Sequence, residues 1–281
     1  MMIHILMSTY NGEQYLPEQL ESIIAQTYTD WHLYVRDDGS SDNTRRIVER
    51  YAESDKRITL LPDDGKNMRA MKSFIYLLSN YGDADYVAFA DQDDVWLPEK
   101  LEICLNVIKS KENLYGQKTP IVVHTDLFVV DSNLNQISPS FWKYSNIRTD
   151  LIDTHLQYMA ISNSVTGCAM LFNKAATINS LPFPDQAYMH DAWISLKTYV
   201  QGGYVIPIPE PTIMYRQHHT NVLGAVRYSV FGRNISTRIE DAKRSYSMSE
   251  GLVYNSVISF VFWKIIYIVH RLLTSHRLKN E

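Results

Sequence analysis

Strands and helices alternate through the first hundred residues, and this alternation constrains the fold more than any other feature of the chain. Short apolar runs of strand length are each followed by a segment whose apolar residues recur at helical spacing. The strands predicted in this way are 2–8, 31–35, 57–61 and 86–90, and the helices are 13–26, 44–54, 68–80 and 98–110. Such alternation predicts the α/β class, with a mostly parallel sheet flanked by helices on both faces. Ligands bind such sheets beyond the carboxyl ends of the strands.

From residue 121 onward the pattern is looser. Further strands are predicted at 121–130, 167–173, 204–208 and 212–215, and a helix at 190–200. With 281 residues, the chain is long enough for one large α/β domain and an appendage.

The tail of the chain, residues 226–281, has a different character. Residues 251–273 are rich in Val, Ile, Phe, Trp and Tyr, with Lys264, His270 and Arg271 interspersed. Lys264 falls near the middle of this run, where a membrane-spanning helix would bury its charge at the highest cost. We therefore expect a helix that lies in the plane of a membrane. A helix packed on the protein's own core and a spanning helix are the alternatives.

Charge is distributed unevenly along the chain. The formal net charge is −4, but the first hundred residues carry −8 and residues 227–281 carry +5. An acidic first part suits a cation site, and a basic tail suits an anionic surface. The sequence lacks the clustered basic residues of a nucleic-acid-binding protein, so no nucleic acid is expected as a partner.

The cysteine pattern and the N-terminus predict a cytoplasmic protein. Cys104 and Cys168 each lie among apolar neighbours, as small core residues do, and provide no disulfide or zinc framework. A reducing compartment is the default for such a chain. The first residues contain no basic region and too short an apolar run for a signal peptide, and fit a strand of the mature fold.

The strongest chemical signal is the segment DQDD at 91–94, which directly follows the apolar strand 86–90. Two carboxylates two residues apart at the end of a strand can share one divalent cation, whose other positions would accept diphosphate oxygens. Hard oxygen ligands favour Mg²⁺ or Mn²⁺ over softer metals. The alternative is an acidic turn that caps the following helix, and Asp94 fits that role.

A second acidic segment, VRDDGSSDNT at 35–44, follows the second strand. A carboxylate here can accept the imide N–H of a uracil or thymine ring, while Gly39 allows close approach of the backbone. The alternative is a tight Asp-Gly turn without a ligand.

Three motifs in order carry a family resemblance, and they are STYNG at 8–12, DDGSSDNT at 37–44 and DQDDVWLPEKL at 91–101. Together they resemble family 2 glycosyltransferases of the GT-A fold, over about residues 1–225. The DQDDVW form, with YRQHHTNVLG at 215–224, is similar to bacterial rhamnosyl- and hexosyltransferases of surface polysaccharide assembly.

The resemblance implies a division of labour within the GT-A domain of residues 1–225. Residues 1–120 would bind the nucleotide sugar and residues 121–225 would face the acceptor, while residues 226–281 would form a helical, membrane-proximal extension. One sugar, rhamnose or a hexose, would pass with inversion from a UDP- or dTDP-sugar to a hydroxyl of a polyprenyl-diphosphate-linked acceptor. The protein would be cytoplasmic and peripheral at the inner face of the cell membrane.

At the donor side, the resemblance implies roles for five residues. Thr9 and Tyr10 would border the nucleotide, and Asp38 would contact the pyrimidine base. Asp91 and Asp93 match the family's DxD motif, with Asp93 as the direct metal ligand and Asp91 shared between metal and substrate.

Arg69, Trp193 and His218 are further candidates. Arg69 stands in a segment that often reads Asn-Leu-Gly in the family, at the position where glycine is usual, and is a candidate substrate contact. His218 falls on the family's usual histidine and could reach the metal or the diphosphate. Trp193 could stack on an acceptor sugar ring, and packing in the core is the alternative.

Asp191, in the segment MHDAW, matches the position of the family's catalytic base, with His190 where many members carry glutamate. An inverting transfer is one in-line displacement, in which the attacking hydroxyl must lose a proton. Asp191 would accept that proton. Its alternative role is to cap the helix predicted at 190–200.

Three rival functions are weaker. A processive synthase would carry a Gln-x-x-Arg-Trp motif and several spanning helices, and the chain has neither. A sugar-1-phosphate nucleotidyltransferase would need a glycine-rich loop with arginine after the first strand, which STYNG does not supply. The presence of Asp38, Asp91, Asp93 and Asp191 argues against a catalytically inactive scaffold that binds nucleotide sugars, and a donor hydrolysis assay would decide between the two.

Overall fold

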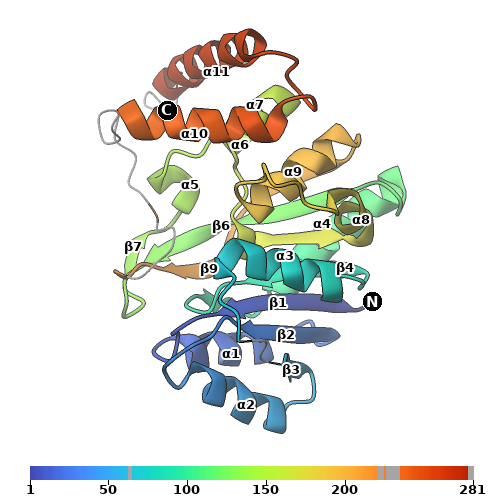
Figure 1. Ribbon diagram of the computed structural model, residues 1–281, viewed down its shortest axis with the longest axis vertical. Coiled ribbons are helices and arrows are strands. Elements are labelled where there is room, and N and C mark those ends of the chain that lie inside the picture. Colours follow the sequence, from blue (N-terminus) through green and yellow to red (C-terminus); the bar gives the residue numbers. More distant parts are fainter. Residues whose placement is uncertain (63–64, 220–224, 226–234, 278–281) are drawn as a thin grey trace.

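The computed structural model describes residues 1–62, 65–219, 225 and 235–277, which form an α/β fold around one central sheet (Figure 1). The strands are β1 (Ile3–Thr9), β2 (Trp31–Asp37), β3 (Ile58–Leu60), β4 (Tyr86–Ala90), β5 (Val95–Trp96), β6 (Ile121–Val130), β7 (Gln136–Ser138), β8 (Met170–Asn173) and β9 (Tyr204–Arg216). The longer helices are α1 (Leu16–Ile24), α2 (Thr44–Ser54), α3 (Arg69–Tyr81), α4 (Lys100–Tyr115), α9 (His190–Val200), α10 (Ile235–Ser249) and α11 (Val257–Arg277). Short helices are α5 (Phe141–Tyr144), α6 (Thr149–Ile152), α7 (Leu156–Ile161) and α8 (Lys174–Ser180).

The sheet is mixed, which refines the prediction of a mostly parallel one. In the order β3-β2-β1-β4-β8-β6-β9-β5, the first four strands run parallel to one another. β8 is antiparallel to both β4 and β6, whereas β6 and β9 are parallel. β5 and β7 are antiparallel to their partners. The α/β class is confirmed, and the parallel half is the part whose strand–helix alternation predicted it.

Each face of the sheet packs against its own helices. In β1, Ile3, Ile5 and Met7 belong to a core shared with α1, α2 and α4, whereas Leu6 belongs to a core shared with α3 and α9. This alternation follows from the two-residue period of a strand. β4 is buried at every position, as expected of a strand covered on both faces.

Two predicted boundaries are wrong, and both errors involve β9. The helix expected at 98–110 begins at Lys100, because Val95–Trp96 forms the short strand β5 beside β9. The strands expected at 204–208 and 212–215 are one strand, β9, whose pairing with β6 shifts register opposite Asp126. Three prolines lie in this strand, and the irregular register accommodates them.

The C-terminal helices α10 and α11 pack against α7 and lie at the top of Figure 1. Phe260 and Tyr267 of α11 are buried in the same core as Leu6 of β1 and Phe89 of β4. The sequence offered packing on the protein's own core as an alternative for residues 251–273. One face of α11 packs in this way. Among the described residues, no helix combines the length and apolarity needed to cross a bilayer. The domain boundary predicted at residue 225 adjoins 226–234, which lie outside the described residues.

Candidate active site

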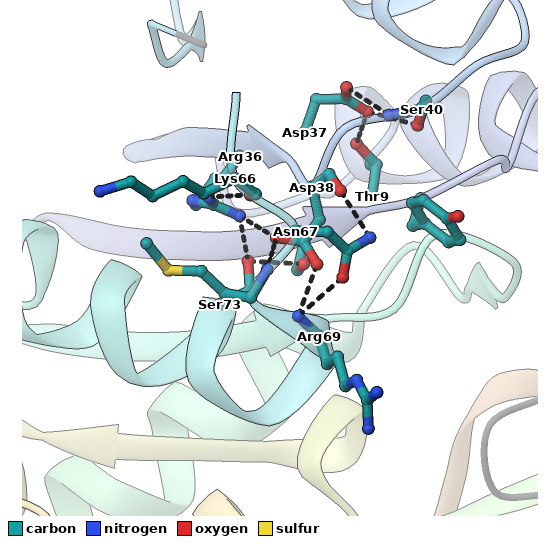
Figure 2. Close-up of polar contacts among 12 residues, drawn as sticks. Thr9, Arg36, Asp37, Asp38, Ser40, Lys66, Asn67, Arg69 and Ser73 are labelled. Carbon is teal, nitrogen blue, oxygen red and sulfur yellow. Dashed lines mark hydrogen bonds and ion pairs between the residues drawn. The ribbon is translucent and has the colours of Figure 1, made fainter. Parts of the chain in front are cut away.

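The turn after β2 is held to the end of β1 by buried polar contacts (Figure 2). The Thr9 hydroxyl donates to Asp37 at 3.1 Å, and Asp37 also accepts the Ser40 N–H at 3.0 Å. Gly39 has φ 84°, a conformation that glycine adopts without strain. Thr9 is fully buried, so its hydroxyl shapes the turn, whereas the neighbouring Tyr10 is half exposed at the same edge.

Asp38 anchors the segment that precedes α3. Its carboxylate accepts the N–H groups of Met68 at 2.8 Å and Arg69 at 2.7 Å, together with the Arg36 guanidinium. The Asn67 side chain donates to the Asp38 carbonyl at 2.8 Å. Asp38 is only 2% exposed and orders the loop that precedes α3, so its predicted contact with a pyrimidine stays a prediction.

The sequence analysis missed Arg36. It is buried between β2 and α3, where it also donates to the Lys66 carbonyl at 2.9 Å. Arg36 and Asp38 are two residues apart at the end of a strand, so they share a face. This two-residue spacing could have predicted from the sequence that Arg36 contacts Asp38.

Arg69 occupies a backbone conformation that favours glycine. Its φ is 64°, in the left-handed region, where a side chain costs about 1–2 kcal/mol. Glycine, which the family resemblance led us to expect here, would adopt this conformation without that cost. The side chain is exposed, extends away from Asp38 in Figure 2, and makes no hydrogen bond among the described residues.

The carboxylates of the acidic segment 91–94, which follows β4, differ in their exposure to solvent. Asp91 and Asp93 are partly exposed, whereas Asp94 is fully buried. Asp94 accepts the backbone N–H of Arg216 at 3.1 Å, so it holds β9 and does not cap α4. The Asp93 carboxylate lies 2.9 Å from Nε2 of His218.

Asp91 carries the clearest electrostatic signature of the site. Desolvation raises its pKa to about 7, and the nearby charges of Asp93 and Asp191 add to the shift. Asp91, at the end of β4, is therefore repelled by two neighbouring carboxylates, and a bound cation would relieve this repulsion.

Another set of possible ligand atoms belongs to Asp91, Asp94 and Cys168, which lie within 4.8 Å of one another. Burial raises the pKa of the Cys168 thiol well above its usual range, so the thiol is protonated. A buried thiol is a poor ligand for a hard cation. The carboxylates of Asp91 and Asp93 are therefore better suited to such a cation, and His218 contacts Asp93.

Asp191 lies in the first turn of α9, 7% exposed, and its carboxylate accepts the N–H of Ala192 at 2.6 Å. Burial raises its pKa to about 6. The residue at the N-cap position is Met189, so Asp191 is not the cap that the alternative interpretation required. The structure brings this carboxylate into the same charge cluster as Asp91.

His190 is a core residue despite its position beside Asp191. Its ring packs 4.7 Å from the rings of Phe74 and Phe89, and neither nitrogen has a hydrogen-bond partner among the described residues. Burial lowers the pKa of His190 to about 4, so the ring is neutral. It packs so closely on Gly167 that a Cβ there would lie 2.7 Å from Nε2.

Trp193 also lies in the core. Its side chain is 5% exposed, and the indole N–H donates to the Ser180 carbonyl at 2.8 Å. The predicted stacking on an acceptor sugar does not fit this environment, because the ring is covered by protein. Core packing is the correct interpretation.

Arg216 is the second residue that the sequence analysis missed. It is 2% exposed, and its guanidinium donates to the carbonyls of Asp93 at 2.8 Å and Ser132 at 2.7 Å and pairs with Glu18. The Tyr15 ring lies 4.5 Å from this guanidinium and 4.8 Å from the ring of His218. Arg216 therefore fixes the main chain of the acidic segment while His218 contacts its carboxylate.

The fold and the clustered carboxylates define a glycosyltransferase of the GT-A type, and comparison with known proteins agrees. The chain belongs to glycosyl transferase family 2, whose model matches residues 4–177. Asp191 and His218 lie beyond the residues that the model matches.

The dTDP-rhamnosyl transferase RfbG of Shigella flexneri is 29% identical over 92% of this chain and 93% of its own. The Escherichia coli glucosyltransferase WfgD, described as acting on α-D-GlcNAc-diphosphoundecaprenol with UDP-Glc, is 35% identical over 38% of this chain and 41% of its own. The chain is thus a nucleotide-sugar-dependent glycosyltransferase related to bacterial surface-polysaccharide enzymes.

Solved structures share the fold at low sequence identity. S. aureus TarS 1–349 in complex with UDP-GlcNAc matches with a TM-score of 0.63 at 17% identity, over 90% of this chain and 68% of that one. The mannosyltransferase PcManGT from Pyrobaculum calidifontis, in complex with GDP-Man and Mn²⁺, matches with a TM-score of 0.58 at 17% identity, over 88% and 62%.

Proposed function

We propose that the chain transfers one sugar, rhamnose or a hexose, with inversion from a UDP- or dTDP-sugar to a hydroxyl of a polyprenyl-diphosphate-linked acceptor. The observation that carries this proposal is the buried Asp191 carboxylate within the charge cluster of Asp91 and Asp93. A one-step displacement requires one carboxylate as the base and a cation to stabilise the leaving group, and these residues could supply both. The names of RfbG and WfgD support this choice of donor and acceptor class.

Asp91 and Asp93 would hold a Mg²⁺ or Mn²⁺ ion, with His218 as a further ligand or as a support for Asp93. Two partly exposed carboxylates and one imidazole are suitable donors for such an ion. When bound, the cation neutralises the charge that develops on the departing nucleoside diphosphate.

Asp191 would act as the general base. The acceptor oxygen forms a bond to the anomeric carbon while the bond from that carbon to the diphosphate oxygen breaks. The hydroxyl proton passes to an Asp191 carboxylate oxygen. The raised pKa of Asp191 favours this step, because a carboxylate that binds a proton more tightly is a stronger base.

The proposed activity is tested by incubating the purified chain with a panel of UDP- and dTDP-sugars, Mn²⁺ and a lipid-linked acceptor. We expect acceptor-dependent release of nucleoside diphosphate with one donor, and a product whose anomeric configuration is opposite to that of the donor by NMR. Release without any glycoside product, or a product with retained configuration, would refute the proposed reaction.

Arg216 gives a prediction about the metal. Lysine at this position cannot reach Asp93, Ser132 and Glu18 together, so Arg216→Lys should loosen the acidic segment. Residues that orient metal ligands typically contribute about 10–100-fold to metal affinity. We expect Mn²⁺ to bind at least about tenfold more weakly, as measured by electron paramagnetic resonance titration.

The matched control for that measurement is Arg57→Lys. The Arg57 guanidinium also stacks on an aromatic ring, Trp31, at 4.0 Å, and pairs with Asp55 at 2.7 Å. It lies at the amino end of β3, so Mn²⁺ affinity should not change. Unchanged Mn²⁺ affinity in Arg216→Lys would show that Arg216 serves the fold alone.

We also propose that the protein acts as a peripheral protein at the cytoplasmic face of the cell membrane. A polyprenyl-linked acceptor is confined to the bilayer, so an enzyme held at that surface meets it at a higher local concentration.

A further inference from the structure

The outward face of α11 carries the largest series of exposed apolar side chains on one element of the described chain. These side chains, here called the α11 stripe, are Ile258, Val261, Phe262, Ile265, Ile268, Val269, Leu272 and Leu273. Each is between 46% and 82% exposed. Their spacing of mostly three and four residues places them along one side of a helix about 30 Å long.

The opposite side of α11 is fixed to the protein. Phe260 and Tyr267 are buried, the His270 ring nitrogen lies 3.2 Å from the Tyr158 hydroxyl, and Arg271 donates to the Asn146 carbonyl at 2.8 Å. These contacts fix the orientation of α11, the topmost helix in Figure 1, so the stripe faces away from the rest of the protein.

The charges around the stripe indicate whether a second copy of the chain or a lipid surface would cover it. Residues 251–280 contain no Asp or Glu, and the side chains of Lys264 and Arg271 lie between the stripe and the buried side of α11, near Phe260 and Asn146 respectively. Asp241 of α10 already contributes an acidic group near Lys264. A second copy of α11 would add cations and no Asp or Glu of that helix, so charge would not favour such a pair. An anionic lipid surface would accept both the apolar side chains and the cations.

We infer that the α11 stripe is a docking surface for an anionic lipid bilayer, with α11 lying in the plane of the interface. This inference names the surface through which the proposed membrane-bound acceptor would be reached, and it rests on the proposed function in that respect. In the structure the Lys264 ammonium lies 5.5 Å from the ring of the buried Phe260, and a change of rotamer would bring it to the headgroups with its aliphatic stem along the stripe.

The test is flotation of the full chain with vesicles of phosphatidylglycerol and phosphatidylcholine, compared with phosphatidylcholine alone. The variant Phe262→Ser/Ile265→Ser should bind the anionic vesicles at least about tenfold more weakly than the unmodified chain. Both side chains are more than half exposed, so the melting temperature should not change. The control Leu114→Ser/Ile137→Ser replaces two exposed apolar residues on α4 and β7, and should bind like the unmodified chain.

Equal binding by the stripe variant, or no binding by the unmodified chain, would overturn the inference. Light scattering on the same samples tests the alternative, in which a second copy of the chain covers α11. If the unmodified chain were a dimer and the stripe variant a monomer, the stripe would be a dimer interface. The assay contains neither donor nor acceptor. A chain that binds vesicles but transfers no sugar would therefore contradict the proposed function and leave the docking surface intact.

Discussion

Replacing Asp93 with alanine should lower the transfer rate at least about 10³-fold, equivalent to about 4 kcal/mol of barrier. Asp93 and Asp91 are the carboxylates we assign to the cation, and His218 contacts the first of them. The fold should survive, because Asp93 is partly exposed. Its charge also repels Asp91 and helps to raise the pKa of Asp91, so its removal relieves that repulsion.

The measurement is the transfer rate of the unmodified chain and of Asp93→Ala, with chelator and then with excess Mn²⁺ or Mg²⁺. Chelator should abolish transfer by the unmodified chain, and the metal should restore it. Asp83→Ala is the matched control, since the Asp83 side chain is 87% exposed at the opposite end of the parallel strands. Full activity of Asp93→Ala in chelator would contradict the metal assignment, whereas a lowered melting temperature would point to a structural role.

Much of the parallel half of the fold follows from local sequence rules. Strand–helix alternation is a local pattern, and β4 and α2 begin and end at the predicted residues. The carboxylates at 91 and 93 could be found because they follow an apolar strand directly. Parallel strands then place their carboxyl ends at one edge of the sheet.

The remaining features depend on contacts between distant parts of the chain. The two-residue strand β5 exists only because β9 lies beside it, and no local pattern predicts so short a strand. The interior position of Trp193 and the contacts of Arg216 with Asp93 and Glu18 have the same origin. The family resemblance identified Asp191 and His218, but only the fold brings them to the acidic segment.

The tail is a third case, because its apolar residues divide between two sides of one helix. Apolar content in 251–273 exceeds what one core-facing side of a helix requires. In the structure, α11 buries one side in the core and exposes the other, and the exposed side is the surface that we infer to dock on a bilayer. Composition alone could not divide the apolar residues between these two sides.

Asp191→Asn is the second substitution with a large expected effect. Asparagine keeps the size of the side chain and an oxygen for the Ala192 N–H, but it cannot accept the proton of the attacking hydroxyl. Loss of a positioned base typically costs about 10²–10⁴-fold in rate, or about 3–5 kcal/mol. Donor affinity should be retained, because the metal and pyrimidine contacts involve other residues.

The pH profile distinguishes a base from a structural carboxylate. A general base must be ionised, so the rate should fall as the pH drops through the pKa of Asp191. That pKa is raised to about 6 by burial, and a cation beside Asp91 would lower it again. We therefore expect an acid limb at or below about pH 6, absent from the residual activity of Asp191→Asn.

The most direct test of the proposed mechanism is the transfer rate of purified Asp191→Asn at saturating Mn²⁺, with donor affinity and melting temperature measured on the same sample. We predict a rate at least about 10²-fold below that of the unmodified chain, with the other two quantities unchanged. Near-normal transfer by this variant would contradict the account, because the displacement would then proceed without the base to which we assign it.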